Sequence, residues 1–346
     1  MGIGFSQGAL SFMNLGIGII GFCGHAYLAM QGWELLRSQG IELELIGVAT
    51  DSDSSIPSEA LSSLSKNYKT FASWEDLIND PAVDVVVVDG PYYLHAAMSS
   101  AALLAGKHVF AEKLVALDWS QYDLLLRAYE ETREQSLHFW SMMALRYAAP
   151  FYTAISALKS NVIGSLRQVH MQKSYKNGTR PDWYGDREKY GGTIPWVGSH
   201  ALDLIYVVAG QAQSTSAVQT QCPEGYERSA FIQSRHAAGV LSSASLDFYR
   251  PATASTHADD RLRLVGDAGV IEARGGEVFI INDDGERLLE LIDPRDDVFA
   301  AGLRFIVGQI SCDFSAQEVF DVARFCLRAR DSADAGGQLK TVQELI

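Results

Sequence analysis

The sequence predicts an α/β protein of two domains: a doubly wound parallel sheet, then an α+β domain with a large, mostly antiparallel open sheet. Its 346 residues exceed one ordinary core, at roughly 150 residues per domain. Residues 1–140 alternate short β-branched runs with helical runs, which is the order of a parallel sheet covered by helices. Residues 214–292 contain strand-like runs joined by glycine-containing turns, which is typical of an antiparallel meander.

Strands of the first domain are expected at four short apolar runs, residues 15–20, 41–49, 83–88 and 108–111. The run at 83–88 is nearly all valine, which indicates a strand buried on both faces. Helices are expected between the strands, at 25–38, 73–78 and 95–105, and after Asp118. Ser73 and Asp76 have capping-box spacing, as do Asp118 and Gln121. This order predicts right-handed connections, with ligands bound beyond the C-terminal ends of the strands.

The second half is expected to contain helices at residues 150–159, 199–209 and 314–330. Its strands are expected at 217–220, 239–248, 261–265, 270–273, 278–281 and 288–291, with hairpin turns at Gly275-Gly276 and Asp284-Gly285. Helices would cover one face of this sheet. Because an exposed sheet of this length is a liability, we expect a second copy to cover the other face, in a homodimer or homotetramer.

Composition excludes several classes of function. Lys and Arg number 28 against 42 Asp and Glu, so a net charge of −14 would repel nucleic acid. The four cysteines form no Cys-x-x-Cys pair and none has a His at zinc-ligand spacing, so we expect free thiols, no metal and a cytoplasmic location. Residues 1–33 are uncharged, but they lack the cation of a signal peptide, and glycines interrupt them. We therefore expect no membrane role, with residues 1–13 as an extension.

A phosphate-binding turn is expected between the first strand and the first helix. The pattern G-x-G-x-x-G occurs at Gly16–Gly21, but its glycines lie within the strand itself. The turn that would face a pyrophosphate follows it, at Gly21, Phe22, Cys23, Gly24, His25 and Ala26. Cys23 replaces the glycine that normally allows close approach to the phosphates. An ordinary strand-to-helix turn is the alternative interpretation.

Asp51 follows the second strand, 25 positions beyond Ala26. A carboxylate there can accept both ribose hydroxyls of an adenosine and would repel a 2′-phosphate. No Arg or Lys lies within residues 49–55, so NAD is favoured and NADP stays possible. Alternatively, Asp51 is simply a turn residue. We therefore predict a dinucleotide-binding Rossmann domain over residues 14–140 and a domain for substrate binding and oligomerisation over residues 141–346.

Several motifs occur together in a specific order. They are Pro91-Tyr-Tyr-Leu-His95, Ala105-Gly-Lys-His-Val-Phe-Ala-Glu112-Lys113, Arg146-Tyr147, Ile163-Gly-Ser-Leu-Arg-Gln-Val169, and the segment from Gly191-Gly192 through Trp196 and His200 to Asp203. This set resembles the Gfo/Idh/MocA family of sugar and inositol oxidoreductases, over the chain from about residue 14 to its end.

The resemblance implies a homo-oligomeric enzyme that passes a hydride between a nicotinamide and a hydroxyl-bearing carbon. By the same resemblance Glu112 would contact the nicotinamide ribose, Lys113 would reach the substrate hydroxyl, and His200 would take its proton. Such a reaction needs a base near neutrality, which His supplies, and a desolvated Lys has a lowered pKa. Asp203, one helical turn after His200, would hold a substrate hydroxyl. The cofactor would also be lined by residues after the strand at 83–88, namely Asp89, Gly90, Pro91, Tyr92 and His95. For His95 a capping role is equally open.

Two positions depart from the family pattern. Leu114 stands where the family has Pro, and Trp196 stands where it has the Asp that orients the catalytic His. His200 would then be oriented by Asp203, by a backbone carbonyl or by the substrate. Trp196 would offer an apolar face on which a sugar can stack.

Other residues are expected near the cleft, either as substrate contacts or as packing: Arg146, Arg180, Trp183 and Tyr184. The predicted substrate is a sugar, a sugar derivative or a cyclic polyol. Two alternatives remain open: a nucleotide-binding sensor of the same fold without turnover, favoured by Trp196 and Cys23, and a dehydrogenase of aromatic dihydrodiols, which also suits Trp196.

Overall fold

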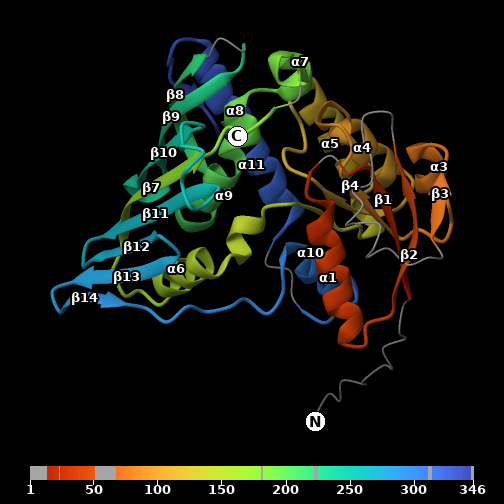
Figure 1. The fold of residues 1–346 in the computed structure, drawn as a ribbon, viewed down its shortest axis with the longest axis horizontal. Helices are drawn as coiled ribbons and strands as arrows, with labels where there is room; N and C mark the ends of the chain where they lie inside the picture. Colours follow the sequence, from red (N-terminus) through yellow and green to blue (C-terminus); the bar gives the residue numbers. More distant parts are fainter. Residues whose placement is uncertain are drawn as a thin grey trace.

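The computed structural model describes residues 14–22, 24–50, 68–180, 182–221, 225–310 and 314–343. Two sheets dominate it (Figure 1). The first has six parallel strands in the order β3-β2-β1-β4-β5-β6. They are β1 (Leu15–Ile20), β2 (Leu43–Ala49), β3 (Lys69–Phe71), β4 (Val85–Val88), β5 (His108–Ala111) and β6 (Phe139–Ser141). The order reverses beside β1, so the predicted doubly wound sheet is confirmed.

Helices of this half follow the predicted pattern closely. They are α1 (Ala26–Ser38), α3 (Trp74–Ile78), α4 (His95–Leu104) and α5 (Trp119–Glu131), with short 3-10 turns at Tyr92–Leu94 and Arg133–Gln135. The Ser73 side chain accepts the Asp76 N–H at the start of α3, and Asp118 accepts the Gln121 N–H at the start of α5. These are the caps that the spacing predicts, and they satisfy backbone donors at each helix start.

The second sheet has nine strands in the order β14-β13-β12-β11-β7-β10-β9-β8-β15. Only β7 and β10 pair in parallel; the other neighbours are antiparallel. The strands are β7 (Leu166–Tyr175), β8 (Ala212–Gln221), β9 (Glu227–His236), β10 (Leu241–Asp247), β11 (Ala258–Gly266), β12 (Val270–Arg274), β13 (Glu277–Asn282), β14 (Gly285–Leu288) and β15 (Lys340–Thr341). This large, mostly antiparallel sheet confirms the expected α+β half.

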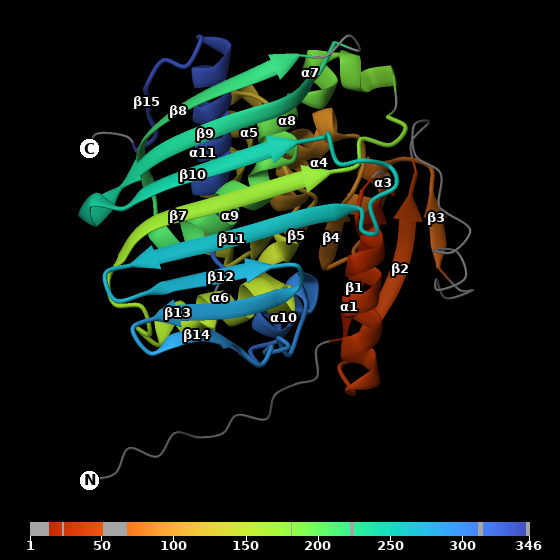
Figure 2. The same ribbon diagram turned by 60° about the vertical axis from the view of Figure 1, so that its left-hand side comes forward.

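Helices cover one face of the large sheet, and Figure 2 shows the strands side by side in front of them. Those against the sheet are α6 (Ala149–Lys159), α9 (Gly198–Ala209) and α11 (Ala316–Asp334). Shorter helical segments are Ala144–Tyr147, Asp182–Gly185, α7 (Arg187–Tyr190), α8 (Thr193–Trp196) and Ala237–Gly239. None of the described helices is long and apolar enough to cross a membrane.

Two C-terminal helices pack back onto the first half. Helix α11 lies between the sheets and contacts β6 and α5 as well as β8 (Figure 1). Helix α10 (Val298–Ile306) packs on α1. Its Phe299 lies 4.9 Å from the ring centre of Phe110, and a Cβ at Gly302 would come within 2.3 Å of the Trp140 indole. The two halves of the molecule therefore share one continuous core.

The sequence misplaced or missed some elements. The expected strand at 288–291 is wrong, because β14 begins at the turn glycine and ends at Leu288. Strands β7 and β9 were not expected, because neither has a continuous apolar run. Polar residues alternate with buried ones in β7, and in β9 Phe231 is exposed while Ser234 and His236 are buried. Helix α10 was not expected either, because it is buried on nearly every side and carries little polar pattern.

Candidate active site

The C-terminal ends of β1, β4 and β5 meet at one edge of the parallel sheet. There the Asp89 N–H bonds to the Ile20 carbonyl at 2.8 Å, and the Glu112 N–H bonds to the Val88 carbonyl at 2.8 Å. Gly21 leaves β1 with φ of +73°, and a Cβ on it would lie 2.5 Å from the Gly90 Cα. Close packing of these strand ends therefore requires glycine in the first turn.

Asp89 caps the N-terminus of α1. Its carboxylate accepts the backbone N–H groups of Gly24 at 3.2 Å, His25 at 3.1 Å and Ala26 at 3.0 Å. A Cβ at Gly24 would lie 2.7 Å from the Asp89 Oδ1, so only glycine leaves room for this contact. Burial and the Glu112 charge raise the pKa of Asp89 well above its usual value, while the three N–H donors oppose that rise.

Glu112 lies directly after β5 and is almost fully buried. Its Oε1 lies 3.1 Å from the His25 Nδ1 and 3.5 Å from the Lys113 Nζ. Burial favours the neutral acid, but the charges of His25 and Lys113 outweigh it and lower the pKa of Glu112. Its Oε2 is buried and has no hydrogen-bond partner among the described residues, which leaves one acceptor for a ligand.

Lys113 is 3% exposed and lies beneath Trp196. Its Nζ donates to the Trp196 carbonyl at 3.3 Å and lies 4.4 Å from the centre of the indole. Burial lowers the pKa of Lys113, against the opposing charge of Glu112. The Lys113–Leu114 peptide bond is cis. Trp196 therefore covers the ammonium group of Lys113, which was predicted to contact the substrate hydroxyl.

His200 lies in the first turn of α9, and its side chain is partly exposed. Burial of the ring, with the charges of Lys113 and Lys173, lowers the pKa of His200 well below its usual value. Its Nδ1 is buried and makes no hydrogen bond within the described part of the chain. Among the described residues, neither Asp203 nor a backbone carbonyl therefore hydrogen-bonds to this nitrogen. That the substrate orients the ring stays a prediction.

Asp203 and Arg146 form a buried ion pair. The Arg146 Nε lies 2.9 Å from both Asp203 oxygens and its Nη2 lies 2.6 Å from Oδ1, while Glu318 approaches at 3.2 Å. Burial raises the pKa of Asp203, against the Arg146 charge. The expectation that these two residues bind substrate is therefore not supported, because each charge already has a protein partner.

Aromatic rings from both halves meet above Lys113. Trp183 lies 5.3 Å from Tyr92 and 4.7 Å from Tyr184, and Tyr184 lies 5.3 Å from Trp196, between ring centres. Tyr190, Tyr226 and Phe248 extend this cluster. Trp183, Tyr184 and Trp196 are thus brought together as expected for residues near one cleft. Tyr92, predicted to line the cofactor, packs against this cluster.

His95 does not have the capping role that the sequence left open, and its contact with the cofactor stays a prediction. It is fully buried, its side chain caps no helix, and its ring nitrogens lie 2.9 Å from the Gly90 carbonyl and 3.2 Å from the Leu114 carbonyl. It therefore ties the turn through Gly90 and Pro91 to the segment after Lys113. Phe22 is partly buried and Ala26 is buried. Cys23 and Asp51 lie outside the described residues.

One further charged residue near His200 was not expected. Lys173 is fully buried on β7, and its Nζ donates to Asp260 at 2.7 Å. Lys173 was not predicted from the sequence as a site residue, because strand β7 was not predicted. The described residues hold no cluster of three or more His, Cys, Asp or Glu side chains placed for a metal ion.

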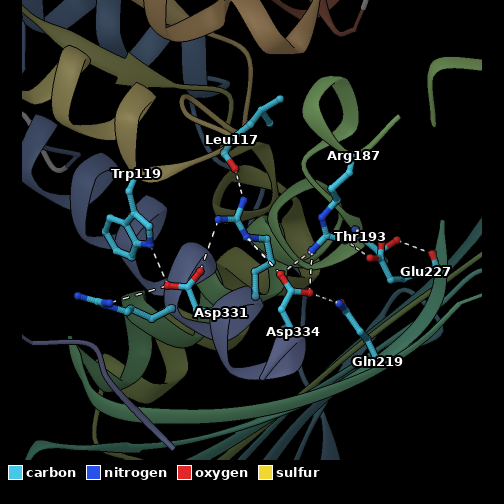
Figure 3. Close-up of polar contacts among 10 residues, drawn as sticks. Leu117, Trp119, Arg187, Thr193, Gln219, Glu227, Asp331 and Asp334 are labelled. Atoms are coloured by element: carbon cyan, nitrogen blue, oxygen red, sulfur yellow. Dashed lines mark hydrogen bonds and ion pairs between the residues drawn. The ribbon is translucent and has the colours of Figure 1, made fainter. Parts of the chain in front are cut away.

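A polar framework holds the aromatic segment in place (Figure 3). Arg187 of α7 pairs with Glu227 on β9 and with Asp334 at the end of α11. Glu227 also accepts the Thr193 N–H at 3.2 Å. Nearby, Arg330 donates to the Leu117 carbonyl, and Trp119 donates to Asp331 at 2.8 Å. Helix α11 therefore fastens both the segment after Lys113 and the segment that ends at Trp196.

Comparisons with known proteins agree with this architecture. A solved structure of an oxidoreductase from Thermotoga maritima is 31% identical in sequence and superposes with a TM-score of 0.88. The match covers 94% of this chain and 100% of the Thermotoga chain. Levoglucosan dehydrogenase of Pseudarthrobacter phenanthrenivorans is 24% identical over 61% of this chain and 55% of its own. Trans-1,2-dihydrobenzene-1,2-diol dehydrogenase of Sus scrofa is 27% identical over 51% of this chain and 52% of its own. The chain thus spans about half the length of these curated relatives.

Family models match both halves. The oxidoreductase family model for the NAD-binding Rossmann fold matches residues 15–139, and the GFO/IDH/MocA C-terminal domain model matches residues 151–272. Both matches fall on the sheets described above, and the resemblance predicted from the motifs is confirmed. The chain belongs to the Gfo/Idh/MocA family of oxidoreductases.

Proposed function

We propose that the protein is an NAD(P)-dependent oxidoreductase that transfers a hydride between the nicotinamide and a hydroxyl-bearing carbon of a sugar, a sugar derivative or a cyclic polyol. One observation carries this proposal. Glu112 and Lys113 lie together at the edge of the parallel sheet where ligands bind in doubly wound folds, and Lys113 of this pair is near enough to His200 on α9 to lower the pKa of its ring.

The residues present fit a nicotinamide dinucleotide. The Glu112 Oε2, which has no partner among the described residues, can accept a hydrogen bond from a ribose hydroxyl. Gly21 and Gly24 leave the turn before α1 free of side chains at these positions. Glu112, His25 and the turn through Gly90 would hold the cofactor, which supplies the hydride acceptor when bound. Asp51 is proposed to favour NAD over NADP.

His200 is the proposed base. Its lowered pKa keeps the ring neutral at neutral pH, so it can accept the proton of the substrate hydroxyl. Lys113 would donate a hydrogen bond to the same oxygen and stabilise the negative charge that develops as the proton leaves. Trp196 would contact the sugar ring with its apolar face, beside the ammonium group that it partly covers.

Calorimetric titration with NAD(H) and NADP(H), followed by a sugar and polyol panel monitored at the nicotinamide absorbance, tests the proposal. We expect cofactor binding and turnover of at least one panel compound. Failure to bind either dinucleotide would contradict the proposed function.

A nucleotide-binding sensor without turnover is the second candidate. It is favoured by the burial of Lys113 beneath Trp196, which restricts access to the ammonium group. Tight cofactor binding with no turnover across the panel is the result that this candidate predicts.

Oxidation of an aromatic dihydrodiol is a third candidate. The joined rings of Trp183, Tyr184 and Trp196 would suit an aromatic substrate, and the similarity to the Sus scrofa dihydrodiol dehydrogenase supports it. The panel should therefore include a trans-dihydrodiol, whose preferential turnover would select this candidate over a sugar.

The outer face of the nine-stranded sheet is the proposed homo-oligomer interface. It carries Phe231 (63% exposed) and Leu241 (48%), beside hollows of about 600 and 440 Å³ lined by residues of β7 to β12. Light scattering should show a dimer or tetramer, and Phe231→Asp should shift it toward monomer. Leu104→Asp, on the exposed side of α4, is the control; an unchanged mass for both variants would place the interface elsewhere or show that none forms. The cytoplasmic location stays a prediction from cysteine usage.

A further inference from the structure

Arg180 lies beside the proposed site with no carboxylate partner. Its guanidinium carbon is 5.4 Å from the ring centre of Trp196, 5.3 Å from Tyr184 and 4.9 Å from Phe248. Its Nε is buried and makes no hydrogen bond, and no ion pair among the described residues includes it. In a chain with a net charge of −14, a cation turned inward without an acidic partner needs explanation.

The neighbouring cations are already compensated. Lys113 lies 3.5 Å from Glu112, and Lys173 lies 2.7 Å from Asp260. With these two pairs neutralised and His200 uncharged, Arg180 adds one unbalanced positive charge to the site. The surrounding rings offer cation–π contacts of about 0.5–2 kcal/mol each, and the Tyr184 hydroxyl hydrogen-bonds to the guanidinium, but among the described residues the Nε–H has no acceptor and no carboxylate balances the charge.

We propose that the substrate carries a carboxylate and that Arg180 binds it, so that the substrate class is the sugar acids. This inference rests on the proposed function. A guanidinium matches a planar carboxylate with two parallel hydrogen bonds, and a single unbalanced charge suits a monoanion better than a phosphate dianion.

The position of Arg180 suits this role. Lys113 and Arg180 lie 4.4 and 5.4 Å from the centre of the same indole, and the Arg180 charge acts on Lys113, so the two cations are near enough for different groups of one sugar-sized molecule. The reacting hydroxyl would then meet Lys113 and His200, and the carboxylate would meet Arg180. The carboxylate takes no part in the hydride or proton transfer and only orients the ring.

Matched substrate pairs test the inference: glucuronate with glucose, galacturonate with galactose, and gluconate with glucitol. We expect the wild-type protein to prefer the acid in kcat/KM by at least about 10-fold, since hydrogen bonds to charged groups contribute about 1.5–3 kcal/mol. Arg180→Met should lower this acid-to-neutral ratio by about 10- to 100-fold, and Arg180→Lys should restore part of it. Arg167→Met is the matched control, because Arg167 pairs with Asp267 on the surface at the other end of β7.

The outcomes separate the two proposals. Turnover of neutral compounds with no acid preference, or a ratio that survives in Arg180→Met, overturns the sugar-acid inference and leaves the oxidoreductase standing. If nothing turns over, calorimetry with NADH-saturated protein replaces kcat/KM, and acids that bind no better than their neutral partners overturn it as well. Failure to bind NAD(H) or NADP(H) defeats the proposed function instead. Thermal melting of each variant checks that a changed ratio does not come from a damaged fold.

Discussion

Replacing Lys113 with methionine is expected to lower turnover about 100-fold or more, the usual contribution of a positioned proton-transfer group. Methionine keeps the apolar stem beneath Trp196 and removes only the ammonium charge, so the fold should be retained. His200→Gln should lower turnover by a similar factor. Lys159→Met, on the exposed end of α6, is the control. Unchanged turnover in both site variants would rule out the proposed proton path.

The pH profile of the Lys113→Met variant gives a second readout. Burial and then the Lys113 charge lower the pKa of His200, so the neutral ring persists well below pH 6.5 in the wild type. Without that charge the pKa of His200 rises toward its ordinary value. The acid limb of kcat/KM should therefore lie at a higher pH in the variant. A limb that does not move would show that His200 is not the titrating base.

Breaking the ion pair between Arg146 and Asp203 is expected to cost about 3–5 kcal/mol of unfolding free energy, because one charge is left buried without its partner. Asp203→Ala leaves Arg146 with Glu318 alone, at 3.2 Å. The double replacement Arg146→Met with Asp203→Leu should regain much of the loss, since well-packed apolar residues can substitute for a buried pair.

Urea unfolding midpoints of the single and double variants measure this effect. If the Asp203→Ala variant loses less than about 1 kcal/mol of unfolding free energy and has a raised KM, Asp203 binds substrate rather than stabilising the fold. The reverse pattern, a large loss of stability with little change in KM per folded molecule, supports the structural pair.

The central strands of the parallel sheet were predictable because they are buried on both faces, so runs such as Val85–Val88 are continuous and apolar. The half-buried strands β7 and β9 gave no such run. Apart from Phe231, the residues on their exposed face are polar, and only alternate positions contribute to the core. The sequence therefore predicted the frame of the first half more completely than the sheet of the second.

For the candidate site, a residue's position at the end of a predicted strand could be read from the sequence, but the side-chain contacts between distant residues could not. Glu112 and Lys113 could be proposed as site residues because they follow a buried strand at its ligand-binding end. By contrast, Arg146 and Asp203 are 57 residues apart, and nothing in either local sequence indicates that they meet. The same holds for Trp196, whose place in the motif was evident while its contact with the Lys113 ammonium group was not.

The return of α10 to the first sheet has a consequence for synthesis on the ribosome. All six parallel strands have been synthesised once Ser141 is added, yet Phe110 and Trp140 pack against Phe299 and Gly302 only when α10 has also been made. Until residue 306 leaves the exit tunnel, the apolar surface around Phe110 and Trp140 is not covered by α10. The sheet that comes first in the chain is thus the one whose folding is completed late, and a holding chaperone would find its binding surface there.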